Sequence, residues 1–272
     1  MRDRFAKAGI ASAPLDARLL AEKAFAIDGL LLITSENDKA SPDQIEALEA
    51  LAIRRLTGEP VARIMGTKEF YGLEFALNAA TLVPRPETEL LVELGLQSVK
   101  DCASPSVLDL GTGSGCIPIA LLVNCAKARA VAVDLSEQAL EQARANGAHH
   151  GVSNRMDLRK GSWFEPLEMD SRFDLIVSNP PYIESRAIAQ LDREVRLHDP
   201  ILALDGGVDG LAPYRIIAEN SQQHLLPGGV VVVEVGLGQA KIVAEMFIAA
   251  GFKQSLVHDD LAGKPRAVLS VI

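Results

Sequence analysis

Four residues that follow an apolar run could grip an amide group. The run "FDLIV" at 173–177 is followed by Ser178 and then by Asn179, Pro180, Pro181 and Tyr182. Paired prolines fix the backbone and cannot continue a central strand, so a rigid turn is the simplest interpretation. The side-chain carbonyl of Asn179 and the backbone carbonyl of Pro180 could also accept hydrogen bonds from both N–H groups of an amide. Tyr182 could pack its ring against the same amide.

An amide nitrogen is a poor nucleophile because its lone pair is delocalised, and an ordinary side-chain base cannot deprotonate it near neutral pH. Holding both of its protons would instead aim the nitrogen at a methyl donor, and positioning would supply most of the rate. This chemistry makes Asn179, Pro180 and Tyr182 candidate catalytic residues. Together with Pro181 they are also the candidate substrate-binding residues.

A glycine-rich segment indicates a cofactor site. "VLDLGTGSG" at 107–115 joins a strand pattern to a helix pattern, and its candidate cofactor-binding residues are Gly111, Thr112, Gly113, Ser114 and Gly115. Glycine lets the backbone turn sharply and approach a ligand, and a helix N-terminus presents unpaired N–H groups. A dinucleotide fingerprint would need its third glycine at position 116, where this chain has Cys116. The spacing therefore favours S-adenosylmethionine.

Two more residues fit a nucleoside. Asp134 ends the strand pattern "RAVAVD", where a carboxylate can accept hydrogen bonds from both ribose hydroxyls. Dinucleotide-binding folds use the same device, and a loop residue near a helix cap is the plainer interpretation. Trp163, the single tryptophan, could stack on an adenine or simply pack in a core. With Asn179, these two complete the predicted cofactor-binding set.

The order of the apolar runs predicts the scaffold. From position 106 onward, continuous apolar strands alternate with helical segments, which is typical of a doubly wound α/β fold with a mostly parallel sheet. The last two runs are separated only by "DDLAGK", so we expect an antiparallel hairpin at the edge of the sheet. In such a sheet the "FDLIV" strand lies beside the first strand, which places Asn179 at the carboxyl edge where ligands bind.

The first quarter of the chain has a different character. Apolar residues in 17–25 recur at helical spacing, and Ser41, Pro42 and Gln44 predict a capped second helix. The basic pair Arg54 and Arg55 is interpreted as part of a solvated face. Apolar residues at 71, 73, 75 and 77 alternate, which predicts a small β element. We predict a helical domain at 1–68, a β linker at 69–83 and a catalytic domain at 84–272.

Composition narrows the function classes. The net charge is -9 and the pI is about 5.1, which argues against binding driven by nucleic-acid phosphates. Three cysteines form no disulfide framework, and the N-terminus lacks the apolar core of a signal peptide. No run is long enough to span a membrane, and the five histidines lack metal-ligand spacing. We expect a cytoplasmic monomer with no bound metal, no membrane contact and no direct nucleic-acid contact.

Five segments together carry a resemblance. They are "GEPVARIMGTKEFYGLEF", "LVPRPETELLVE", "VLDLGTGSGC", "VSNPPYI" and "DGGVDGLAPYR". Their combination resembles the HemK/PrmC family, the protein-(glutamine-N5) methyltransferases that modify peptide-chain release factors. The resemblance covers nearly the whole chain, and it departs from the family only at Pro118, which predicts a helix that begins later than usual.

The resemblance implies a class I S-adenosylmethionine-dependent methyltransferase fold, Rossmann-like, with a small N-terminal helical domain that helps to dock the release factor. It implies that the glycine loop, Asp134, Trp163 and Asn179 bind S-adenosylmethionine. It also implies that Asn179 to Tyr182 hold the glutamine of the Gly-Gly-Gln motif of class 1 release factors. Arg85, Glu87 and Glu89 would then lie near the mouth of the cofactor site.

Two other functions remain as alternatives. The same turn could serve methylation of a glutamine on a ribosomal protein, or of an exocyclic amino group on a nucleic-acid base. A nucleotide-binding oxidoreductase is the third class. Cys116 in place of the third glycine and the asparagine–proline turn weigh against it, and no acid or base for hydride transfer is evident.

Overall fold

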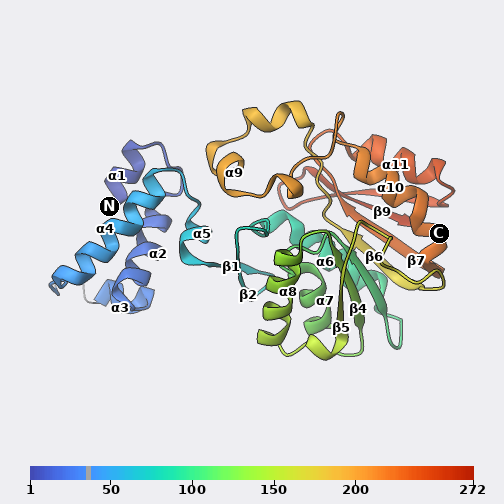
Figure 1. The fold of residues 1–272 in the computed structure, drawn as a ribbon, viewed down its shortest axis with the longest axis horizontal. Helices are drawn as coiled ribbons and strands as arrows, with labels where there is room; N and C mark the ends of the chain where they lie inside the picture. The colour runs from blue at the N-terminus through green and yellow to red at the C-terminus, as the bar shows by residue number, and fades with distance from the viewer. Residues whose placement is uncertain (35–37) are drawn as a thin grey trace. The chain divides into compact units, whose positions relative to one another are not determined.

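The chain divides into two compact units. The computed structural model describes residues 1–34 and 38–272. One unit is formed by 1–68 together with the segment 192–198, and the other by 69–191 together with 199–272 (Figure 1). No helix in the described ranges combines the length and the apolar character needed to cross a bilayer. In the same ranges, no group of three or more His, Cys, Asp or Glu residues could hold a metal ion.

The first unit is a small helical cluster. Its helices are α1 (Arg2–Lys7), α2 (Ala13–Phe25), α3 (Gly29–Thr34), α4 (Pro42–Leu56), α5 (Val61–Met65) and α9 (Arg193–His198). Its core contains Phe5, Leu20, Ala52 and Ile64. The predicted cap of α4 is present: the Gln44 N–H donates to Ser41 Oγ at 3.2 Å, and the Ser41 N–H donates to Gln44 Oε1 at 2.8 Å.

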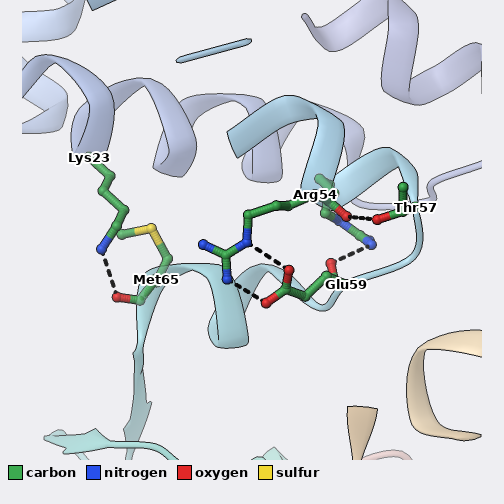
Figure 2. A network of polar contacts seen from close by, with 6 residues as sticks. Lys23, Arg54, Thr57, Glu59 and Met65 are labelled. Atoms are coloured by element: carbon green, nitrogen blue, oxygen red, sulfur yellow. Dashed lines mark hydrogen bonds and ion pairs between the residues drawn. The ribbon is translucent and has the colours of Figure 1, made fainter. Parts of the chain in front are cut away.

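Polar contacts fix the path of the chain from α4 into α5 (Figure 2). The Arg54 guanidinium donates to both carboxylate oxygens of Glu59, at 2.7 and 2.5 Å. The Thr57 hydroxyl donates to the Arg54 carbonyl at 2.8 Å. Lys23 of α2 donates to the carbonyl of Met65, the last residue of α5, at 2.9 Å. The bonds of Arg54 and Thr57 hold the turn that follows α4, and the bond of Lys23 ties α5 to α2.

The expectation that Arg55 lies on a solvated face is wrong. Its side chain is 4% exposed, and its Nε donates to Asp16 Oδ2 at 2.6 Å, with Asp16 itself 1% exposed. Glu194 of α9 pairs with Arg55 Nη1 at 2.7 Å, and the Glu59 carbonyl accepts from the same nitrogen. A guanidinium needs many acceptors, and helix periodicity could not show that Asp16 would come within reach of it.

The second unit is built on a seven-stranded sheet in the order β5-β4-β3-β6-β7-β9-β8. Its strands are β3 (Ser106–Leu110), β4 (Arg129–Asp134), β5 (Met156–Lys160), β6 (Phe173–Ser178), β7 (Leu225–Glu234), β8 (Gln254–Asp259) and β9 (Pro265–Val271). The strands β5, β4, β3, β6 and β7 pair in parallel, and β9 pairs antiparallel with both β7 and β8. This topology confirms the predicted doubly wound sheet with an antiparallel edge hairpin.

Helices cover both faces of the sheet, namely α6 (Glu89–Ser98), α7 (Cys116–Asn124), α8 (Glu137–His149), α10 (Ala212–Ser221) and α11 (Ala240–Ala249) (Figure 1). Neighbouring apolar residues of the central strands β3, β6 and β7 alternate between two cores. Val107 and Val177 join the core under α6 and α7, whereas Leu108 and Ile176 join the core under α10 and α11. The helix α7 begins at Cys116, so Pro118 does not delay its start; proline costs no helix bond in a first turn.

The small β element predicted from the alternation over 71–77 is a two-stranded hairpin. β1 (Thr67–Phe70) and β2 (Leu73–Ala76) form a two-stranded sheet. Tyr71 and Gly72 form the turn between them with φ of 52° and 74°, the left-handed backbone that two-residue hairpin turns require. The alternation of apolar residues continued through this turn, so the pattern alone could not reveal it.

The buried ion pair generates a stability prediction. Asp16→Ala leaves the Arg55 guanidinium buried with less compensation, and we expect the helical unit to lose about 3–5 kcal/mol of unfolding free energy. Amide hydrogen exchange in α2 and α4 measures this loss. The exposed pair Arg4 and Glu49 supplies the control, since Glu49→Ala should leave exchange in those helices unchanged. Equal protection in Asp16→Ala and the parent would contradict the role given to the ion pair.

Candidate active site

The carboxyl edge of the parallel strands borders a cavity of about 590 Å³ that lies within the second unit. Its wall includes the glycine loop after β3, Asp134 at the end of β4, Trp163 beyond β5 and Asn179 after β6. The size is that of a small-molecule site. The structure therefore brings most of the residues singled out in the sequence to one cavity.

The glycine loop is held by backbone bonds in a shape that only glycine adopts easily. Gly111 and Gly113 have φ of 77° and 55°, and among the described residues no atom outside the adjacent ones lies within 4 Å of the position that a Cβ would occupy at either residue. The N–H groups of Gly111 and Thr112 donate to the Val133 carbonyl at 2.9 and 3.0 Å. The loop is thus tied to the end of β4 while its glycines line the cavity with Thr112 and Ser114.

Gly115 is absent from the described lining of the cavity. It is the N-cap of α7 with φ of 79°, and a Cβ there would lie 3.0 Å from Ile119 and 3.1 Å from Ala143 of α8. Its packing between α7 and α8 by itself accounts for a glycine at this position. Asn146 of α8 also braces the loop, because its Nδ2 donates to the Ser114 carbonyl at 2.8 Å.

Asp134 joins the glycine loop to the cavity wall. Its Oδ2 accepts from the Gly113 N–H and its Oδ1 from the Ser136 N–H, both at 2.8 Å. Burial raises the pKa of the Asp134 carboxyl, and the backbone N–H groups of Ser136, Gly113 and Leu135 oppose that rise. The side chain that caps α8 is Ser136, whose Oγ accepts from the Ala139 N–H. Each Asp134 oxygen retains a lone pair for a hydroxyl group.

Trp163 lines the cavity with a backbone that bulky residues rarely adopt. Its φ is 50°, in the left-handed region, and its side chain packs in part against the core under α10 and α11. Backbone outliers of this kind concentrate at ligand sites. Both of the predicted environments, core and cavity, therefore apply to the one indole ring.

The asparagine–proline turn leaves β6 at the same edge. Asn179 and Pro181 line the cavity, while Pro180 is buried and Tyr182 is half-buried behind them. Burial first, and then the charge of Glu234, raise the pKa of Tyr182 to about 12, so its hydroxyl stays protonated. In the described part of the chain, Pro180 and Tyr182 are not among the lining residues.

A glycine-rich loop packs directly on this turn. A Cβ on Gly206 or Gly210 would lie 2.8 or 2.4 Å from backbone atoms of Tyr182, and one on Gly236 would lie 2.9 Å from the ring. Gln239 donates to the Tyr182 carbonyl at 2.9 Å. The segment "DGGVDG" at 205–210 is therefore glycine-rich because it must approach the backbone of the turn closely.

Arg85, Glu87 and Glu89, which were expected near the mouth of the cofactor site, lie in different surroundings. Arg85 lines the cavity, and its Nη2 donates to Asp199 Oδ2 at 2.8 Å. Glu89 faces the β1–β2 turn, where its Oε1 accepts from the Tyr71 N–H at 2.9 Å. Glu87 is half-buried and is absent from the described lining of the cavity. Of the three, only Arg85 is placed to meet a ligand in this cavity.

Sequence reasoning missed three buried polar residues. Asp109 of β3 is fully buried, and within the described residues neither of its carboxylate oxygens has a hydrogen-bond partner. Burial raises the pKa of Asp109 to about 7; the nearby Thr112 hydroxyl opposes this rise and the charge of Asp134 adds to it. A charged residue inside the apolar run "VLDL" was the available signal.

The other two are Thr88 and Glu234. Glu234 ends β7 and is 1% exposed, and Thr88, which is 2% exposed, donates its hydroxyl to Glu234 Oε2 at 2.5 Å. Asn179 Nδ2 donates to Thr88 Oγ1 at 3.1 Å. Burial raises the pKa of Glu234 to about 7. The signal for Glu234 was again a carboxylate at the end of an apolar strand, "VVVVEV"; nothing in the pattern marked Thr88.

The raised pKa of Asp109 generates a prediction. The folded protein holds the Asp109 proton between its unfolded pKa near 4 and its folded pKa of about 7, so stability is lost as the pH rises through this window. Asp109→Asn cannot titrate. On going from pH 5 to pH 8, the parent should therefore lose about 2–3 kcal/mol of unfolding free energy that this variant does not lose. Denaturant titrations at both pH values measure the difference, and parallel pH curves would contradict the assignment.

Two protein-family models match the chain. The PrmC N-terminal domain matches residues 1–66, and the methyltransferase small domain matches residues 87–195. Among solved structures, the catalytic domain of hMettl16 in complex with MAT2A 3'UTR hairpin 6 aligns with a TM-score of 0.62 at 16% identity, over 79% of this chain and 82% of that one. A methyltransferase from Pyrococcus furiosus aligns with a TM-score of 0.53 at 18% identity, over 82% of this chain and 98% of that one. At these identities the likeness shows the fold.

Several release factor glutamine methyltransferases are much more similar to this chain in sequence than these structures are. A release factor glutamine methyltransferase of Agrobacterium fabrum is 42% identical over 98% of this chain and 93% of its own length. One of Bradyrhizobium diazoefficiens is 44% identical over 97% of this chain and 90% of its own length. One of Caulobacter vibrioides is 41% identical over 99% of this chain and 93% of its own length. The chain belongs to the family of release factor glutamine methyltransferases.

Proposed function

We propose that the protein transfers a methyl group from S-adenosylmethionine to the side-chain nitrogen N5 of the glutamine in the Gly-Gly-Gln motif of class 1 peptide chain release factors. One observation carries the proposal: Asn179 lines the same cavity as the glycine loop and Asp134. A group that binds amide protons therefore borders the space suited to a nucleoside. Membership of the family supports the choice of substrate.

The cavity fits the proposed cofactor. Gly111 and Gly113 leave open space where side chains would otherwise project. The Asp134 carboxylate can accept ribose hydroxyls, and Trp163 offers an aromatic wall for the adenine. When bound, S-adenosylmethionine would supply a sulfonium methyl group: the C–S bond breaks, a C–N bond to the amide forms, and one amide proton leaves to water.

The residues of the turn would orient the amide. The Asn179 side-chain carbonyl and the Pro180 backbone carbonyl would each accept one N–H of the glutamine. Proline fixes the backbone, so these two acceptors keep their spacing. Tyr182 supports the turn from behind, packed by Gly206, Gly210 and Gly236. The protein would supply position rather than a base, since no side chain can deprotonate an amide near neutral pH.

The proposal extends to partners and location. We assign release-factor docking to the helical domain at 1–68, joined to the catalytic domain at 84–272 by the β linker at 69–83. The segment 192–198, which follows the asparagine–proline turn in the chain, packs with the helical unit through Arg55 and Glu194. Since release factors work at the ribosome, we place the enzyme in the cytoplasm, as a monomer.

Methylation of a nucleic-acid base is the second candidate, because similar turns could grip any NH2 group. The net charge of -9 disfavours it, since binding to phosphate backbones rests on neutralising their charge. A glutamine on a ribosomal protein would use the same chemistry as the release factor. The experiment below separates all three substrates.

The test is mass spectrometry after incubation with methyl-deuterated S-adenosylmethionine. Release factor, ribosomal protein and DNA are supplied separately, with the parent enzyme and with Asn179→Ala. We expect one methyl on the Gly-Gly-Gln glutamine with the parent, and a rate lower by about 100-fold or more with Asn179→Ala. Asn220→Ala, which changes an asparagine on α10, is the control and should retain the rate. Label on DNA or on ribosomal protein alone would overturn the proposed substrate.

Cofactor binding gives an independent prediction. Asp134→Ala removes the acceptor proposed for the ribose and also the bond to the Gly113 N–H, so calorimetry should show affinity for S-adenosylmethionine weakened by about 10- to 100-fold. Asp260→Ala is the control, since that carboxylate accepts backbone N–H groups in the β8–β9 turn. Equal affinities for Asp134→Ala and the control would refute the role of Asp134.

A further inference from the structure

Three polar side chains at the turn form a hydrogen-bonded chain, in which Glu234 and Thr88 are buried and Asn179 is half-buried. Glu234 at the end of β7 accepts the Thr88 hydroxyl at 2.5 Å, and Thr88 Oγ1 accepts Asn179 Nδ2 at 3.1 Å. Thr88 ends the 3-10 turn Pro86–Thr88, which directly precedes α6. The Tyr214 hydroxyl donates to the Glu234 carbonyl at 2.9 Å, which holds the end of β7 in place. The chain thus joins four separate elements at the cavity wall.

The single hydroxyl proton of Thr88 determines which group donates in each of these hydrogen bonds. A hydroxyl group has one proton to donate, and the Thr88 proton is given to the Glu234 carboxylate. Thr88 Oγ1 can then only accept a further bond, so it can pair only with the NH2 side of the Asn179 amide. The opposite side, Oδ1, is left for the cavity. A flipped Asn179 would set its carbonyl against an oxygen with no proton to offer.

We propose that Thr88 and Glu234 are positioning residues that fix the Asn179 amide with Oδ1 available to the substrate. The expected effect on the methylation rate rests on the proposed function, because an acceptor at this position is needed to hold the N–H groups of a glutamine. With the amide flipped, an NH2 group would face another NH2 group. The orientation itself is a property of the enzyme alone.

Protonation of Glu234 would loosen this control. A carboxylic acid can donate to Thr88 Oγ1, which frees the Thr88 proton for Asn179 Oδ1 and allows the flipped amide. Burial raises the pKa of Glu234 to about 7; the Thr88 hydroxyl, Arg266 and Asn179 oppose this rise, and Glu87 adds to it. The charge of this carboxylate also contributes to raising the pKa of Tyr182 and of Tyr214. The turnover rate should therefore rise with pH through the region near 7, where Glu234 loses its proton.

The first test reads the orientation directly. Nitrogen-15 NMR of asparagine-labelled enzyme reports the Asn179 NH2 group, which Asn179→Ala identifies by its loss. In the parent we expect slow exchange with solvent and a shifted proton, because one N–H is bonded to Thr88. In Thr88→Val this protection should be lost, and in Thr88→Ser it should return. An Asn179 signal that is the same in all three proteins overturns the proposal, whatever the enzyme methylates.

The second test measures the effect of this orientation on the rate of methylation. Thr88→Val and Glu234→Gln should lower kcat on release factor by about 10- to 100-fold and abolish the rise of kcat with pH, while affinity for S-adenosylmethionine stays within about twofold. Thr88→Ser should restore both the rate and the pH profile. Ser221→Ala is the control, since it also removes a buried hydroxyl, one that donates only to the Ile217 carbonyl.

The two proposals fail in different ways. A parent enzyme that leaves release factor unmodified refutes the proposed function, while the NMR test still decides the orientation. An active parent whose kcat and pH profile are unchanged by Thr88→Val refutes the positioning role. A loss of rate in Thr88→Val that Thr88→Ser fails to restore also contradicts it, because a hydroxyl at position 88 is all that the account requires.

Discussion

The parallel register of four strands is the constraint on which this structure depends. Leu110 of β3 lies level with Val133 of β4 and with Ser178 of β6, and Ser178 lies level with Val233 of β7. The residue after each of these is the one with chemistry to offer: Gly111, Asp134, Asn179 and Glu234. A sheet with this register has to present a backbone loop, two carboxylates and an amide at one edge, side by side.

That arrangement costs stability. Asp109 and Glu234 are buried carboxyl groups, and burial raises the pKa of each to about 7. Glu234 is partly compensated by Thr88, whereas within the described residues the carboxylate oxygens of Asp109 have no hydrogen-bond partner. Two apolar cores, one on each face of the sheet, offset the cost. The polar edge is tolerated because the apolar scaffold around it is extensive.

Much of the fold could be predicted from the sequence. Apolar strands alternating with helices fix a doubly wound sheet, and the short "DDLAGK" link fixes the edge hairpin, because both follow from local pattern. The glycine loop, Asp134 and Asn179 could be located because they end strands that share one edge. Trp163 also reached the cavity wall, through a left-handed backbone that no pattern indicates.

What could not be predicted depends on contacts between distant segments. Thr88 and Glu234 are 146 positions apart, and Arg55 and Asp16 are 39 apart, so no periodicity relates them. The hairpin turn at Tyr71 and Gly72 was hidden because its residues continued the alternation of the strands. Gly115 could not be separated from the loop glycines, since packing against α8 is a tertiary contact.

The most direct measurement is a crystal structure of the enzyme with S-adenosylhomocysteine and a peptide that contains Gly-Gly-Gln. The account predicts the cofactor product against Asp134 and the glycine loop. It also predicts the glutamine nitrogen within about 2.7–3.2 Å of both Asn179 Oδ1 and the Pro180 carbonyl oxygen. A glutamine side chain bound elsewhere, with the turn contacting only protein, would contradict the central claim that this sheet edge brings an amide and a methyl donor together.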